Sequence, residues 1–147
     1  MDHDEQKRFN KELAIFYNAI YRNAKILAGQ DVNANIGVQS EMFSDVIGTH
    51  GLGNRNAKGK DLLFLLKSIK PRVLITYFKH RNYTTWVSFN YTRYTHMLDT
   101  FICSRPFFRQ VKDCKLFNIG MRRNHTSILT TFKITAIKLK VTEKIIA

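Results

Sequence analysis

Hydrophobic side chains at the start of the chain recur at three- and four-residue steps, which is the spacing of one face of an α-helix. They run from Phe9 to Tyr21 and predict an amphipathic helix over residues 4–22. Asp2 and Asp4 stand at its start, where either carboxylate can accept from the free N–H groups of the first turn. This segment is therefore expected to pack one face against the rest of the fold.

The pattern then changes from helical spacing to short runs. A strand is expected near Lys25–Ala28, and residues 29–59, which hold six of the seven glycines, predict loops with a short helical turn around Gln39–Val46. The apolar side of DLLFLLKSI predicts a second helix over about Ala57–Ser68, which Pro71 stops. Five β-branched or aromatic runs then predict strands: RVLITYF, YTTWVSF, HMLDTFIC, CKLFNI and TSILTTFKI.

This order of elements predicts an α/β (α+β) domain with a mixed, mostly antiparallel sheet. A chain of 147 residues with 44% hydrophobic and 12% aromatic side chains is expected to fold as one domain. The longest purely apolar run, Leu62–Leu66, is too short to cross a bilayer, so no membrane partner is expected. The charged N-terminus predicts no secretory signal and hence an intracellular, nuclear or cytoplasmic protein. Cys103 and Cys114 cannot form a zinc set by themselves.

Basic residues are concentrated in the second part of the chain. Residues 1–50 hold five Lys/Arg against seven Asp/Glu, whereas residues 51–147 hold nineteen against four, within a net charge of +13. An excess of that size favours a polyanion such as DNA or another nucleic acid, because binding releases counterions. The alternative is that the lysines and arginines only keep the domain soluble.

Four polar side chains are candidates for phosphodiester chemistry. Asp31 and Asn33 follow the first predicted strand, and each is also a common turn former. Asp99 places a carboxylate inside the apolar run HMLDTFIC, where it needs a partner. His125 opens the last predicted strand, and a histidine there can carry a proton or donate to a phosphate at neutral pH. A carboxylate that orients a histidine is common in hydrolytic sites.

The order of these pieces resembles the C-terminal half of the endonuclease/exonuclease/phosphatase superfamily, and more closely the apurinic-endonuclease-like domain of non-LTR retrotransposons. That family has a strand ending in G-D-x-N-A, a G-x-H-G-x-G-x-x-N-x-x-G pattern before a Leu/Phe helix, a T-x-F strand, a T-W pair, an L-D strand and S-D-H before the last strand. The corresponding pieces here are AGQDVNAN with Gln30 inserted, GTHGLGNRNAKG, TYF, Thr85–Trp86, Leu98–Asp99 and Arg123–His125. The resemblance covers nearly the whole chain.

The resemblance implies a partial four-layer α/β-sandwich and Mg²⁺- (or Mn²⁺-) dependent hydrolysis of DNA. By position, Asp31 would orient or deprotonate the attacking water, while Asn33 and His125 would bond the phosphate oxygens. Asp99 would orient His125. The residues nearest the metal would be Asp31, Asn33 and Asn124, where Asn124 stands in place of the family's aspartate.

In that family an N-terminal half supplies the principal metal-binding glutamate, and nothing in residues 1–24 replaces it convincingly. We therefore expect residues 1–147 to form a single, N-terminally truncated domain with little activity alone. One alternative is a non-catalytic, basic nucleic-acid-binding remnant. Another is a structural piece that associates with itself through an exposed sheet face.

Overall fold

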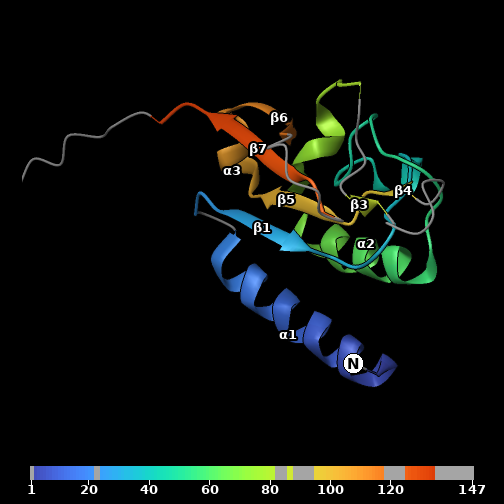
Figure 1. Cartoon of the computed structure of the whole chain (residues 1–147). Coiled ribbons are helices and arrows are strands. Elements are labelled where there is room, and N and C mark those ends of the chain that lie inside the picture. Colours follow the sequence, from blue (N-terminus) through green and yellow to red (C-terminus); the bar gives the residue numbers. More distant parts are fainter. Residues whose placement is uncertain (1, 22–23, 82–85, 88–94, 118–124, 135–147) are drawn as a thin grey trace, which may run out of the picture.

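The computed structural model describes residues 2–21, 24–81, 86–87, 95–117 and 125–134. Within these ranges the two long helices, with one strand between them, precede a run of short strands, as predicted (Figure 1). They are α1 (His3–Tyr21), β1 (Leu27–Asp31), η1 (Glu41–Phe43), α2 (Ala57–Ile69), β2 (Arg72–Val73), η2 (Leu74–Tyr77), β3 (Trp86–Val87), β4 (Thr95–His96), β5 (Asp99–Cys103), α3 (Arg105–Phe108), β6 (Val111–Phe117) and β7 (Ser127–Phe132).

Both long helices begin at the side chains that can satisfy their first N–H groups. The Asp2 carboxylate accepts from the N–H groups of Asp4 and Glu5, so Asp2 is the cap of α1. Asn56 caps α2 by accepting from the Gly59 N–H. That helix ends at Lys70, whose backbone is left-handed with φ of 55°, and its apolar side is buried in the core.

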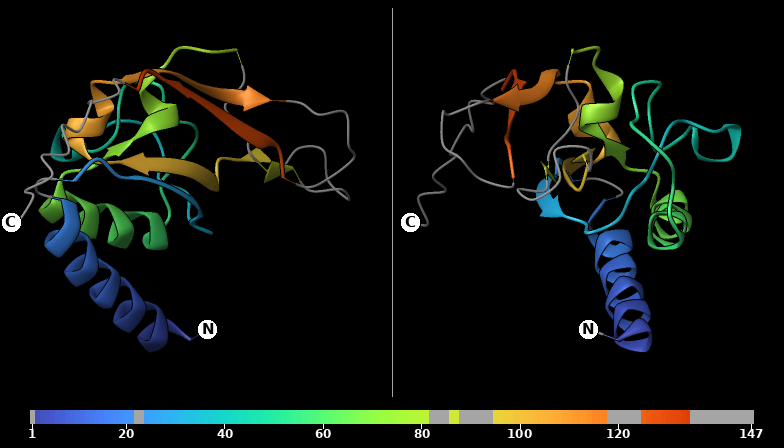
Figure 2. Two further views of the ribbon diagram at one scale, coloured as in Figure 1. Left: turned by 90° about the vertical axis from the view of Figure 1, so that its left-hand side faces the viewer. Right: turned by 45° about the vertical axis from the view of Figure 1, so that its right-hand side comes forward.

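The strands form antiparallel pairs, which confirms the predicted α/β (α+β) class. The largest sheet has the order β1-β5-β2, and β3 pairs with β4 and β6 with β7. Helices α1 and α2 lie on one side of the three-stranded sheet, and the β6–β7 ribbon lies on the other (Figures 1 and 2). The layers thus place the end of β1, the start of β5 and the start of β7 near one another.

The first strand ends three residues later than predicted. Gly29 favours a turn by composition, but the pairing with β5 continues through Gly29 and Gln30 to Asp31. Contacts beyond both ends reinforce this pairing, since the Val32 N–H donates to the Leu98 carbonyl and the Ser104 N–H donates to the Ile26 carbonyl. The inserted Gln30 is therefore a regular strand residue.

The RVLITYF run is a strand only over Arg72–Val73, and η2 replaces the rest of the predicted strand. The reason is Thr76, whose buried hydroxyl donates to the Val73 carbonyl at 2.6 Å and closes a local turn. The same hydroxyl accepts from the Gly48 N–H at 2.8 Å, which attaches the preceding loop to η2. A side chain that is satisfied in this way stabilises the turn over an extended backbone.

The remaining strand predictions are correct in place and differ in extent. HMLDTFIC divides into β4 and β5 around the buried Met97. The strand predicted for CKLFNI begins earlier, at Val111, and the short helix α3 before it was not predicted. Of the YTTWVSF run, the structure describes only the part in β3. Self-association through an exposed sheet face stays a prediction.

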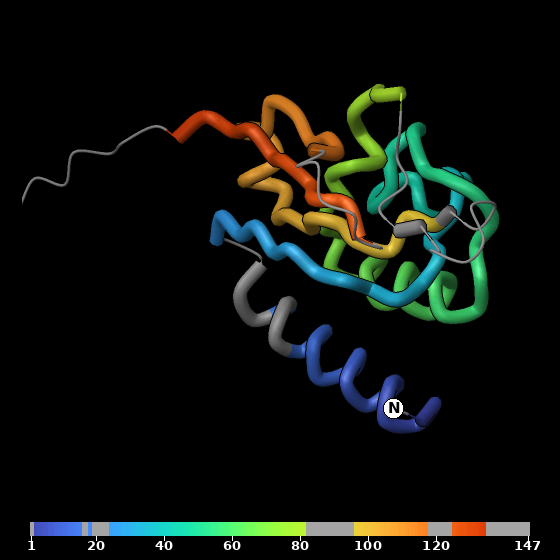
Figure 3. The backbone as a smooth tube through the Cα atoms, viewed as in Figure 1, coloured from blue at the N-terminus to red at the C-terminus, as the bar shows by residue number. Residues whose placement is uncertain are grey.

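The long loop between β1 and α2 folds along one end of the molecule, and its course can be followed from cyan to green in Figure 3. Arg55 holds this loop in place. Its guanidinium donates to the Ile36 and Val38 carbonyls and lies over the Phe43 ring, 4.8 Å from the ring centroid. Desolvation lowers the pKa of Arg55 from its usual value. The loop is thus a built part of the core.

Cys103 and Cys114 are both buried and free. Burial raises the pKa of Cys103 to about 12 and that of Cys114 to about 11, so both thiols stay protonated at neutral pH. A protonated thiol is a poor nucleophile, so neither cysteine is a candidate for chemistry. In the described part of the chain no helix has the length and apolar character needed to traverse a bilayer.

We predict that Gly59→Ala destabilises the protein by about 3 kcal/mol, the upper end of overpacking. An added Cβ at this position would overlap the Asn35 carbonyl oxygen, which cannot easily move away because it belongs to the backbone. Gly53→Ala is the matched control. Its φ of +71° carries a strain of about 1 kcal/mol, but no atom lies within 4 Å of the added carbon. Urea unfolding compares the two variants, and equal costs would contradict the close approach.

Candidate active site

The antiparallel register of β1 and β5 places two carboxylates directly opposite each other. Five consecutive pairs run from Leu27–Cys103 to Asp31–Asp99. Because directly opposed residues in an antiparallel pair project to the same face, the side chains of Asp31 and Asp99 are neighbours. This contact joins two residues that lie far apart in the sequence.

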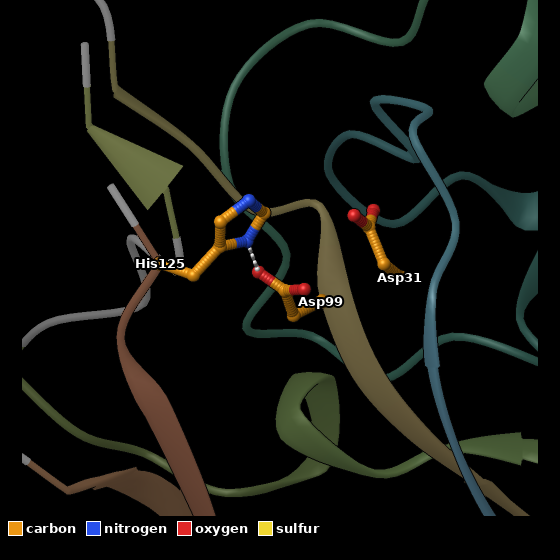
Figure 4. A group of neighbouring side chains, drawn as sticks. All are labelled: Asp31, Asp99 and His125. Carbon is orange, nitrogen blue, oxygen red and sulfur yellow. Dashed lines mark hydrogen bonds and ion pairs between the residues drawn. The ribbon is translucent and has the colours of Figure 1, made fainter. Parts of the chain in front are cut away.

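His125 completes the group from the second ribbon. It lies just before β7, and its Nδ1 is 2.8 Å from Oδ2 of Asp99 (Figure 4). The Asp99 side chain is 21% exposed and that of His125 is 47% exposed, so the pair stands at the surface with its carboxylate partly buried. An Nδ1–H that donates to Asp99 leaves Nε2 for a second partner.

A tight turn holds Asp31 from the other side. The Asn33 N–H donates to Oδ1 of Asp31 at 2.9 Å, which is the bond of an Asx turn. Asn33 itself has a left-handed backbone with φ of 45°, a conformation that asparagine tolerates better than most residues. Both residues are thus turn formers, and the same turn directs the Asp31 carboxylate.

The three side chains form a compact set of ligand atoms. One atom from each of Asp31, Asp99 and His125 lies within 4.8 Å of the other two. An octahedral Mg²⁺ holds its ligands at about 2.0–2.1 Å, so opposite ligands lie about 4.2 Å apart. Two carboxylates that face each other across a strand pair repel, and a cation between them removes that repulsion. The donor set therefore fits a divalent cation after a small adjustment.

Asn33, the other described residue predicted as a metal ligand, borders a neighbouring pocket together with Asp31. Its role as a ligand stays a prediction. Asn124 lies outside the described residues, so its role as a metal ligand stays a prediction. The catalytic roles of Asp31, Asn33, Asp99 and His125 are likewise predictions.

The structure contains a second histidine–carboxylate pair that was not predicted from the sequence. His80, which follows η2, lies with Nε2 2.6 Å from Oδ1 of Asp113 on β6. Asp113 also accepts from the Cys114 N–H, and Lys115 approaches it at 4.0 Å. The two partners are 33 residues apart, and no spacing rule could have joined them. This pair belongs to none of the clusters of three or more metal-ligating side chains among the described residues.

The chain shares its fold with a solved retrotransposon endonuclease domain. It is similar to the solved endonuclease domain of TRAS1, a telomere-specific non-LTR retrotransposon, with a TM-score of 0.60 and 11% sequence identity. The match covers 88% of this chain and 52% of the other, so the chain spans about half the length of that domain. No protein-family model matches the sequence, and neither does any curated protein. At this identity the likeness establishes the fold alone.

We predict that Asn33→Gly leaves the free energy of unfolding within about 0.5 kcal/mol of the original, whereas Asn33→Val lowers it by about 1–2 kcal/mol. Glycine adopts the left-handed backbone of residue 33 without strain, and valine does not. Urea unfolding of the two variants provides the measurement. If valine were tolerated as well as glycine, the left-handed turn after Asp31 would be wrong.

Proposed function

We propose that this chain is an endonuclease-like domain that hydrolyses DNA phosphodiester bonds with Mg²⁺ (or Mn²⁺). The observation that carries the proposal is the meeting of Asp31, Asp99 and His125 from three separate elements. The fold supports it, since the similar structure is an endonuclease domain. The excess of basic residues after residue 50 supports a nucleic-acid substrate.

Each of the four site residues has its own role in the proposed hydrolysis. Asp31 orients the attacking water and accepts its proton while the water oxygen bonds to phosphorus. The bond from phosphorus to the leaving sugar oxygen breaks, and that oxygen takes a proton from solvent. Asn33 and His125 donate to the phosphate oxygens, on which charge develops. Asp99 bonds Nδ1 of His125 and so turns Nε2 toward the phosphate.

A bound Mg²⁺, held by the carboxylates of Asp31 and Asp99, would supply Lewis-acid polarisation of the phosphate. The opposed carboxylates are the hard oxygen donors that this ion prefers. The reaction is best detected on supercoiled plasmid, where one cut changes the gel mobility of the whole molecule.

We predict that His125→Ala lowers the rate of plasmid nicking in Mg²⁺ by about 10²–10³-fold, because a donor to the developing charge is lost. Asn33→Gly should also lower it, since this variant keeps the turn but removes the amide. EDTA should abolish nicking. The rates are measured by gel under single-turnover conditions.

The matched control is His80→Ala, which breaks a histidine–carboxylate contact of the same kind at Asp113, outside the candidate site. It should nick at the original rate, provided that circular dichroism shows a folded protein. Equal nicking by His125→Ala and the original protein would refute the proposed site. An equal loss in both histidine variants would point to stability as the cause.

A second candidate function is nucleic-acid binding without cutting, which the charge of residues 51–147 favours. It predicts that affinity for DNA falls about 10³-fold or more between 50 and 200 mM salt if six or more phosphates are contacted. It also predicts that Asp31→Ala leaves affinity and salt dependence unchanged. Fluorescence anisotropy measures both, and an affinity independent of salt would contradict this function.

A further inference from the structure

A pocket of about 90 Å³ adjoins the candidate active site between α1, the end of β1 and the start of α2. Asp31 and Asn33 form part of its wall, so the pocket and the proposed cutting site share two residues. Its other walls come from α1 and α2 and include Gln6, Lys7, Phe9, Asn10, Lys58 and Asp61.

We propose that this pocket seats a single nucleobase of the DNA strand, next to the phosphate at Asp31. The inference rests on the proposed function for its orientation, and it names the substrate group that the function leaves open. A base can enter only when it is out of the duplex stack, so the preferred substrate is single-stranded or locally unpaired DNA.

The apolar part of the pocket suits the face of a base. Phe9 on α1 borders the pocket with 52% of its surface exposed, whereas Gln6, Asn10 and Leu13, which also border it, are partly buried. Leu62 supplies an apolar wall from α2 and is itself buried. An exposed aromatic side chain beside a nuclease-type site offers a stacking surface that any base can use. A volume of about 90 Å³ holds several water molecules, which a flat ring can replace.

The polar part suits the edge of a base. The Gln6 amide donates to the Asn10 side-chain oxygen at 3.3 Å. That bond uses neither the side-chain carbonyl oxygen of Gln6 nor the amide protons of Asn10. The first can accept a hydrogen bond from the edge of a base, and the second can donate to it. Side-chain amides pair with base edges in this manner, and a carboxylate such as Asp61 accepts from an exocyclic amino group.

The charged part distinguishes a nucleotide from a neutral aromatic ligand. Lys7 on α1 and Lys58 on α2 both border the pocket and can contact the phosphates on either side of the seated base. The Asp31 carboxylate then lies at the end where the proposed cation would stand. Cations, an aromatic face and amide groups in one pocket match the three parts of a nucleotide.

The test uses two ten-nucleotide DNA strands labelled with fluorescein. One is all thymidine, and the other has the same phosphates but an abasic sugar at every position. Binding is measured by anisotropy in Ca²⁺ instead of Mg²⁺ to suppress cutting. Phe9→Ala should weaken binding of the thymidine strand about tenfold, because the stacking of one base on the aromatic ring is lost. It should leave binding of the abasic strand unchanged.

The matched control is Ile15→Ala. Ile15 is an exposed hydrophobic residue of the same helix, 63% accessible, and is not part of the pocket. This variant should bind both strands as the original protein does. Asn10→Ala gives a second reading and should weaken thymidine binding about threefold without affecting the abasic strand. Lys7→Ala should weaken both strands, in contrast to Lys11→Ala, because Lys11 does not border the pocket.

The inference would be overturned if Phe9→Ala and Ile15→Ala bound the thymidine strand with equal affinity. It would also be overturned if Phe9→Ala lost as much affinity for the abasic strand as for the thymidine strand. If Phe9→Ala does not fold, unchanged thymidine binding by Asn10→Ala would overturn it. Failure of the proposed function is separable. If the plasmid is not nicked but thymidine binding depends on Phe9, the proposed catalytic function is wrong and the proposed nucleobase pocket is supported. If His125-dependent nicking occurs while Phe9→Ala binds the thymidine strand as the original protein does, only the proposed nucleobase pocket is wrong.

Discussion

The pairing of β1 with β5 is the constraint on which the candidate site depends. Five consecutive residue pairs place Asp31 opposite Asp99, and the backbone bonds at Val32 and Ser104 extend the pairing at both ends. A slip of one residue would send the Asp31 side chain to the other face of the sheet. The buried side of β5, with Ile102 almost fully inaccessible, opposes such a slip. Core packing thus positions two charged groups at the surface.

Separate hydrogen bonds position the other parts of the site around Asp31 and Asp99. The Asx turn at Asn33 directs the Asp31 carboxylate, and the Asp99 carboxylate holds His125 at the start of the β6–β7 ribbon. The loop between β1 and α2 contributes by close backbone packing, since its Asn35 carbonyl lies against Gly59 of α2. This packing positions the start of α2, which forms part of the pocket wall. The two opposed carboxylates are the reason that we propose a cation here, whereas the His80–Asp113 contact has no second carboxylate ligand among the described residues.

Much of the fold could be predicted because its signals are local. The helical spacing from Phe9 onward, the apolar side of DLLFLLKSI and Pro71 lie within a few residues of what they determine, so both long helices were expected at nearly their observed bounds. The errors arose where tertiary contacts override local preference. The continuation of β1 through Gly29 needs β5 as its partner, and the turn at Thr76 needs the Gly48 loop. In both cases the partner lies far away in the sequence.

The candidate site shows the same division. The sequence by itself determined the type and order of Asp31, Asn33, Asp99 and His125, from which we predict phosphodiester chemistry. It also determined the excess of positive charge. Only the tertiary structure decided that Asp31 and Asp99 face each other, that His80 has a carboxylate of its own, and that α1 forms a pocket beside Asp31. The reason is physical: residue type sets what a group can do, whereas strand register and packing over long sequence separations set what it can reach.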